Sequence, residues 1–131
     1  MALRRGEVVG LHPEAHLNPS FVPGAAKTGA ARMAISTGAP LLPAVVWGSQ
    51  RILPRGRRPK LPRGVVVEVR VGEPVEFEAA EDPASVTDRL MARIRDLYDR
   101  TVEAYPQRPR DAADRWWLPA HLGGTAPPPD E

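Results

Sequence analysis

The chain has 131 residues, of which 42% are hydrophobic, so we expect a single domain with a small core. It contains no cysteine, which excludes disulfides, thiolate metal sites and cysteine nucleophiles. The net charge is +2. No apolar run approaches the ~20 residues that cross a bilayer, and the first residues lack a signal-peptide core, so we expect a cytoplasmic chain.

The first third of the sequence predicts a strand, a loop, a helix and a second strand. An apolar run over residues 7–12 is typical of a short buried strand. Prolines and glycines make residues 13–24 a loop, and the alanine-rich residues 25–37 form a predicted helix that Gly38 ends. Residues 41–47 are largely apolar, which predicts a strand in a sheet covered on both faces.

A basic loop and a third strand are predicted next. Residues 48–64 combine arginines with prolines, which favours a long loop. Residues 65–71 form the predicted third strand, and the alternating pattern of its second half indicates a position near an edge. We also expect the sheet to have an exposed edge where further strands would pair, and we expect this edge to promote association of the chain.

A long amphipathic helix is predicted over residues 84–104. Its apolar side chains recur at helical spacing: Val86, Leu90, Ile94, Leu97, Tyr98 and Val102. Pro83 favours a start at this point, and Ser85 with Asp88 suggests a capping box. Residues 106–131 are predicted to be an irregular tail, in which the pair Trp116-Trp117 covers the sheet.

Two charged residues stand where an α/β sheet binds anions. Glu14 follows the first predicted strand, and Lys27 lies at the start of the predicted helix, where free N–H groups favour an anion. On the residues alone, Glu14 capping a loop and Lys27 facing solvent remain alternatives. The three histidines lack the spacing of a zinc site, so no metal is predicted: His12, His16 and His121.

Three blocks of the sequence carry a family resemblance: Pro13-Glu14-Ala15, Lys27-Thr28-Gly29-Ala30-Ala31-Arg32 and Pro40-Leu41-Leu42-Pro43-Ala44-Val45. In this order they resemble the C-terminal half of the glycerolipid acyltransferases, above all the 1-acylglycerol-3-phosphate O-acyltransferases (lysophosphatidic acid acyltransferases). The tail around Trp116-Trp117-Leu118-Pro119 is similar to that of some bacterial members.

The resemblance implies an α/β domain with a partial glycerol-3-phosphate acyltransferase-like fold, with about three core strands and two main helices. Residues 1–105 would be the C-terminal portion of the acyltransferase domain, and residues 106–131 a Pro-rich irregular tail. The implied reaction moves an acyl group from acyl-CoA or acyl carrier protein to the hydroxyl of 1-acylglycerol-3-phosphate. No cofactor is implied beyond this acyl donor.

In that family a His-x4-Asp motif removes the hydroxyl proton. This chain lacks the motif, because the residues five positions after its histidines are Leu17, Phe21 and Ala126. We therefore assign no catalytic residue and expect a truncated chain that is inactive alone.

The resemblance gives acceptor-binding or phosphate-binding roles to Glu14, Lys27 and Pro43. The sequence departs from the family at Ala15 and Leu17, where the family has glycine and arginine. Leucine cannot replace an arginine that clamps phosphate, so Lys27 is the remaining phosphate candidate.

The basic loop supplies five candidates for contact with a membrane or with coenzyme A: Arg51, Arg55, Arg57, Arg58 and Lys60. A solvated loop explains them equally well. The implied partners are a lysophospholipid acceptor and an acyl thioester donor, with peripheral contact at the inner face of the membrane. No nucleic acid is expected, because aromatic residues are absent from this loop. The alternatives are a non-enzymatic anionic-lipid-binding module and a non-functional remnant.

Overall fold

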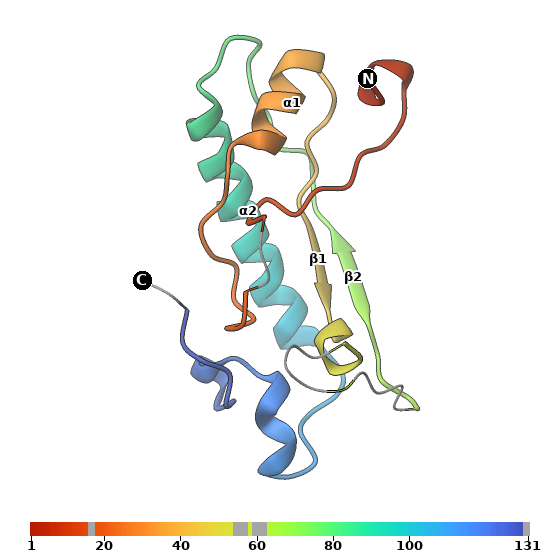
Figure 1. Cartoon of the computed structure of the whole chain (residues 1–131), viewed down its shortest axis with the longest axis vertical. Coiled ribbons are helices and arrows are strands. Elements are labelled where there is room, and N and C mark those ends of the chain that lie inside the picture. Colours follow the sequence, from red (N-terminus) through yellow and green to blue (C-terminus); the bar gives the residue numbers. More distant parts are fainter. Residues whose placement is uncertain (16–17, 54–57, 59–62, 130–131) are drawn as a thin grey trace.

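A computed structural model of the chain describes residues 1–15, 18–53, 58 and 63–129. Figure 1 shows two α-helices and two β-strands, in the chain order α1 (Gly29–Thr37), β1 (Ala44–Trp47), β2 (Glu68–Val71) and α2 (Pro83–Ala104). Short 3-10 helices lie at Leu3–Arg5, Ser49–Arg51, Ala113–Trp117 and Ala120–Leu122. The described part is a small α/β domain, which confirms the predicted class.

The two strands form one antiparallel pair, in which Ala44 lies opposite Val71 and Trp47 lies opposite Glu68. Both strands are found inside the predicted ranges 41–47 and 65–71, but each is only four residues long. A two-stranded sheet of this length is marginal by itself, so its stability depends on what packs against it.

The strand predicted over residues 7–12 is wrong. This segment contains no strand, and Val8 is 96% exposed. An apolar run of this length is buried as a strand only where a neighbouring strand pairs with it. Among the described residues the sheet has two strands rather than three.

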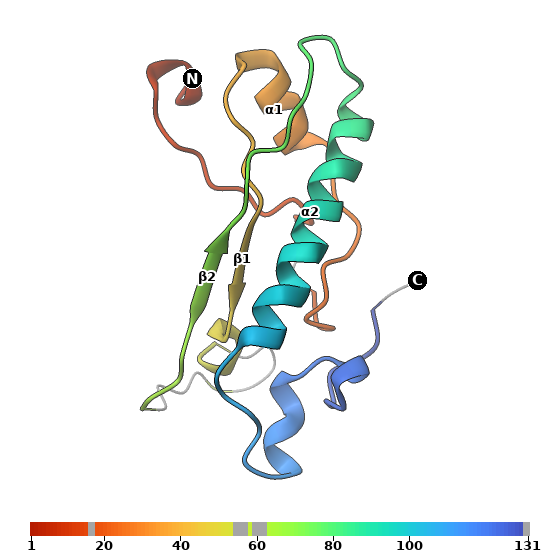
Figure 2. The same ribbon diagram turned by 180° about the vertical axis from the view of Figure 1, so that it is seen from behind.

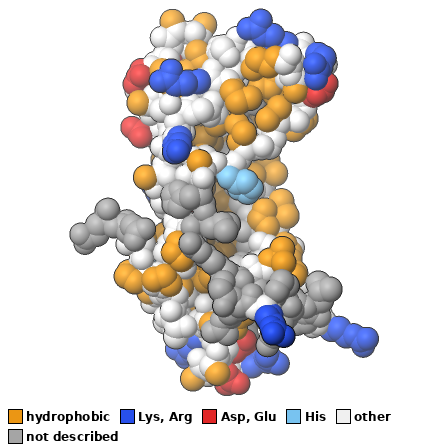
Figure 3. Space-filling view, in the orientation of Figure 1, with side chains coloured by type: hydrophobic (Ala, Val, Ile, Leu, Met, Phe, Trp, Pro, Cys, Tyr) orange, Lys and Arg blue, Asp and Glu red, His pale blue; other side chains and the backbone are white. Residues whose placement is uncertain are grey.

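The two faces of the sheet differ. Helix α2 packs against the face that carries the buried side chains of Val45 and Trp47 (Figures 1 and 2). The other face, which we call the open face, carries five exposed apolar side chains: Leu42, Val46, Val67, Val69 and Val71. The predicted cover on both faces is therefore wrong for the described part of the chain. Figure 3 shows hydrophobic side chains over the middle of the molecule, between charged groups toward its two ends.

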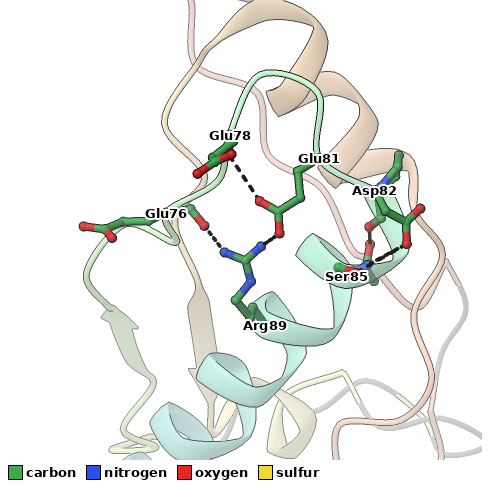
Figure 4. A network of polar contacts seen from close by, with 8 residues as sticks. Glu76, Glu78, Glu81, Asp82, Ser85 and Arg89 are labelled. Carbon is green, nitrogen blue, oxygen red and sulfur yellow. Dashed lines mark hydrogen bonds and ion pairs between the residues drawn. The ribbon is translucent and has the colours of Figure 1, made fainter.

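The helix predicted over 84–104 is confirmed, because α2 begins at Pro83 and ends at Ala104. Its cap differs from the predicted capping box. Asp82 is the N-cap, and its carboxylate accepts a hydrogen bond from the Ser85 N–H over 3.3 Å. Figure 4 shows how Arg89, in the second turn of α2, connects the helix to the preceding segment through the Glu81 carboxylate and the Glu76 carbonyl.

The core lies where the covered face of the sheet meets α2 and the tail. Trp47 meets Tyr98 edge to face, with ring centroids 5.6 Å apart, and Tyr105 stands in the same way between Trp47 and Trp117. The prediction that the tail aromatic pair covers the sheet is confirmed for Trp117, which is 1% exposed and belongs to this cluster.

Candidate functional site

The loop that carries Glu14 folds back onto the segment that precedes α1. The Lys27 N–H donates a hydrogen bond to the Pro13 carbonyl over 2.9 Å. The backbone segments that carry Glu14 and Lys27 therefore lie side by side. The Glu14 side chain is half-buried, and the Asn18 amide donates to its Oε2 over 3.0 Å.

Asn18 organises the rest of this loop. Its Nδ2 also donates to the Val22 carbonyl over 2.7 Å, and its Oδ1 accepts from both the N–H and the hydroxyl of the buried Ser20. Gly24 lies so close that a Cβ there would stand 3.0 Å from Oε2 of Glu14. The carboxylate is thus held in one place by short-range contacts within the loop.

Ala15, directly after Glu14, has a backbone φ of +58°. This left-handed conformation costs an L-residue with a Cβ about 1–2 kcal/mol and is normally taken by glycine.

Helix α1 begins at Gly29 rather than at residue 25, so Lys27 lies two residues before it. The N-cap residue Thr28 makes no capping hydrogen bond to the backbone, and instead its hydroxyl accepts from Nε of Arg32 over 3.0 Å. The first N–H groups of α1 therefore have no side-chain cap, and the Lys27 side chain is exposed next to them. Gly38 ends the helix as predicted, with φ +71°.

Pro43 is fully buried beside the end of β2. Its carbonyl accepts the Gly72 N–H over 2.9 Å, and its Cγ would lie 3.0 Å from a Cβ at Gly72. The structure thus gives Pro43 a packing role, in which a close approach between two backbones requires glycine.

The candidate basic residues of the loop after β1 have different surroundings. Arg55, Arg57 and Lys60 lie outside the described residues. Arg58 is exposed. Arg51 points into the fold: its guanidinium lies 4.5 Å from the ring centroid of Trp117, and Nη1 donates to the Tyr105 hydroxyl over 3.1 Å and to Oε1 of Gln107.

A cavity of about 480 Å³ lies at the end of the molecule where α2 meets the tail. Its apolar wall is formed by eight residues: Trp47, Val102, Tyr105, Pro109, Ala112, Trp117, Leu118 and Leu122. Its polar wall is formed by Gln107, Arg108, Arg110, Asp111 and Arg115. The volume lies within the range of small-molecule pockets, about 300–1,000 Å³.

The charges around this cavity are mostly positive. Partial burial opposes ionisation of Asp114, but the Arg110 N–H and the charges of Arg110 and Arg51 hold the pKa of its carboxyl below the usual range. The Arg110 N–H donates to Asp114 over 3.0 Å. Trp117 Nε1 lies near this carboxylate without reaching hydrogen-bonding geometry.

Two buried polar atoms of the core also have no partner within the described part of the chain: Trp47 Nε1 and the Tyr98 hydroxyl. Burial, reinforced by the charge of Asp99, raises the pKa of Tyr98 well above its ordinary value. Trp47 lines the cavity, but its Nε1 is covered by other atoms of the chain, so this N–H is not presented to the cavity.

None of Glu14, Lys27 and Pro43 lines this cavity, and sequence reasoning had left its arginines in an irregular tail. The available signal was local. Three arginines lie within the eight residues before the pair Trp116-Trp117, with Arg115 directly beside it: Arg108, Arg110 and Arg115. Arginine and tryptophan together are typical of binding surfaces.

Within the described ranges, no helix is long and apolar enough to cross a membrane, and no group of three or more His, Asp or Glu side chains is placed to hold a metal ion. Comparison of the chain with protein-family models, with curated proteins and with solved structures finds no match.

Proposed function

We propose that this chain serves phospholipid synthesis as part of an acyltransferase, which moves an acyl group from acyl-CoA or acyl carrier protein to 1-acylglycerol-3-phosphate. In this proposal the loop before α1 binds the charged head of the acceptor. Glu14 accepts hydrogen bonds from the glycerol hydroxyls, and Lys27 contacts the phosphate. Exposed basic residues such as Arg58 would add peripheral contact with anionic lipid, each worth ~1 kcal/mol near the surface.

The observation that carries the proposal is the hydrogen bond from the Lys27 N–H to the Pro13 carbonyl. It brings the turn with the carboxylate next to the start of α1, whose first N–H groups have no side-chain cap. A phosphate at a helix start is stabilised by such N–H groups and by the helix dipole, and a lysine at this point, which is otherwise slightly unfavourable, is then matched by an anion.

The backbone at Ala15 gives separate support. A left-handed residue directly after the glutamate is what a Pro-Glu-Gly turn would require, and Ala15 adopts this conformation here.

The head-group site is tested with glycerol 3-phosphate, a probe that has no apolar tail. In two-dimensional amide NMR of the full chain, we expect saturable shifts confined to residues 14–15 and 27–31. Lys27→Ala should weaken binding about tenfold, and Glu14→Gln several-fold. Arg95→Ala, an exposed site on α2, removes the same charge as Lys27→Ala and should leave the affinity unchanged. Shifts elsewhere, or equal binding by Lys27→Ala, would refute the assignment.

Catalysis is a separate question from head-group binding. Because the sequence contains no His-x4-Asp motif, we expect no release of free thiol from acyl-CoA when this chain alone is mixed with lysophosphatidate. Binding without thiol release supports an acceptor-binding role that depends on a base from elsewhere. Thiol release by the chain alone would show that another residue acts as the base.

A further inference from the structure

We propose that the open face is a dimer interface, on which a second copy of the chain packs its own open face. Both strands contribute to this face, and its five apolar side chains are 41–63% exposed. A contiguous apolar surface of this kind on a small domain marks an interaction surface. The proposal uses none of the residues assigned to head-group binding, so either proposal can fail without the other.

The open face carries no charge among its described strand residues. Glu68 and Arg70 lie opposite Trp47 and Val45 in the register, so they belong to the covered face, where they pair with each other over 3.4 Å. The open face is left with the exposed Ala44 and the five apolar side chains. Homodimer interfaces have this composition, with an apolar centre and charged side chains at the rim. A surface for anionic lipid or nucleic acid would instead carry basic side chains.

Charged residues of opposite sign stand at the two ends of this face. Arg63 lies before β2 in the chain and Glu73 lies after it, so they stand toward opposite ends of the strand (Figure 1). Both side chains are exposed, and neither makes an ion pair or a hydrogen bond among the described residues. Each end of the face therefore offers one charge that is available to a partner.

A two-fold axis that lies between the two faces and runs across the strands joins these ends. Rotation about this axis reverses the strand direction of the second copy, so Arg63 of each copy meets the partner's Glu73, and the contact occurs twice. An axis along the strands would instead bring like charges together at both ends, which is unfavourable. The charges of the rim thus favour a second copy in one orientation.

The paired rows of the ladder fit the same arrangement. On the open face Ala44 lies opposite Val71, and Val46 lies opposite Val69. The rotation places each row on the other row of the partner, so the small Ala44 side chain faces the partner's Val46. Small side chains that face larger ones let two sheets interdigitate at the ~10 Å spacing of packed sheets. Because a two-stranded sheet is marginal alone, cover on its second face would also stabilise it.

Sedimentation velocity of the full chain over a range of protein concentrations tests the proposal. We expect a reversible equilibrium between monomer and dimer, with no larger species. Val46→Lys, in the middle of the face, should raise the dimer dissociation constant at least ~10-fold, because it places a charge in an apolar interface. The matched control is Val8→Lys, since this side chain is 96% exposed outside the sheet, and it should change the constant less than twofold.

Charge reversal at the rim tests the orientation without changing the apolar face. Glu73→Arg and Arg63→Glu should each weaken the dimer several-fold, because each places like charges together at both ends. The double variant, Arg63→Glu with Glu73→Arg, restores opposite charges and should return the constant to within twofold of the original value. Absence of this rescue would overturn the proposed two-fold arrangement.

Other results would overturn the interface itself. A chain that stays monomeric at every concentration has no such interface. Equal weakening by Val8→Lys would assign the association to general apolar surface, and larger species that Val46→Lys does not reduce would assign it to the edges of the sheet. Binding to phosphatidylglycerol vesicles that Val46→Lys abolishes, without a dimer, would make the open face a lipid contact instead.

Discussion

Removing the hydroxyl group from two tyrosines of the core cluster should change the free energy of unfolding in opposite directions. Tyr98 and Tyr105 are 5% and 2% exposed, and both pack edge to face against Trp47. The Tyr105 hydroxyl donates to the Val66 carbonyl over 2.6 Å and accepts from Arg51 over 3.1 Å. The Tyr98 hydroxyl has no partner among the described residues.

The magnitudes follow from hydrogen-bond accounting. An unsatisfied buried polar group costs about 1–3 kcal/mol, so Tyr98→Phe should raise the free energy of unfolding by about 1 kcal/mol. Tyr105→Phe leaves the Val66 carbonyl without its partner and should lower the free energy of unfolding by about 1–3 kcal/mol. The two variants remove the same atom, so their difference of about 2 kcal/mol or more reports only the partners of that atom.

The assay is urea unfolding at pH 7, followed by far-UV circular dichroism at low protein concentration. The difference should also appear as several degrees in Tm. If Tyr98→Phe destabilises the chain as much as Tyr105→Phe does, the Tyr98 hydroxyl has a partner and the reasoning is refuted.

The buried Tyr98 hydroxyl also predicts that the folded state loses stability at alkaline pH. Burial raises the folded-state pKa of Tyr98 above the unfolded value of about 10. The folded state therefore holds this proton more tightly, and stability should fall as the pH rises above about 10, by at most ~1.4 kcal/mol per pH unit. Tyr98→Phe should remove this part of the pH dependence, and an unchanged slope would contradict it.

Four further substitutions test other parts of the structure. Gly48→Ala should abolish folding or cost several kcal/mol in urea unfolding, because φ is +101° and the new Cβ would lie 2.1 Å from the Val66 carbonyl oxygen. Ala15→Gly should raise the free energy of unfolding by about 1 kcal/mol by relieving the left-handed backbone, and a decrease would contradict that account. Asp114→Asn should destabilise the chain at pH 6, and this loss should shrink as the pH falls below 4, because a lowered folded-state pKa makes the contribution present above the unfolded pKa and lost as the pH falls through the folded one. Val69→Lys should reduce association in analytical ultracentrifugation with little effect on stability, since this side chain lies 63% exposed on the open face, and unchanged association would place the contact elsewhere.

Helix α2 was predictable to within one residue, because its apolar spacing and Pro83 are local signals that the surroundings do not override. The structure of residues 7–12 was not predictable in the same way. An apolar run forms a strand only beside a partner strand, and the run itself carries no signal for whether that partner is present. The start of α1 was placed four residues early, because alanine-rich sequence favours a helix without fixing its first turn.

The sequence indicated the charged residues of the candidate site but not their contacts. The order of Glu14 and Lys27 in the sequence indicated an anion site, but the hydrogen bond that brings their backbones together runs through the Pro13 carbonyl, which has no sequence signature. The cavity was missed for a related reason. Its walls come from β1, the end of α2 and the tail, and proline-rich sequence predicts irregular structure without showing that such structure packs.

The proposed head-group site and the cavity depend on one shared element. The sheet is too small to be stable alone, so the covered face with Val45 and Trp47 is stable only because α2 and Trp117 pack on it. The cavity uses the last turn of α2, at Val102, and α1, which follows the Glu14 loop, packs on α2 as well. A core substitution should therefore weaken head-group binding indirectly, through unfolding. Lys27→Ala changes an exposed side chain, so it should weaken binding of glycerol 3-phosphate without moving the unfolding transition. A lower unfolding transition in Lys27→Ala would contradict this separation of binding from stability.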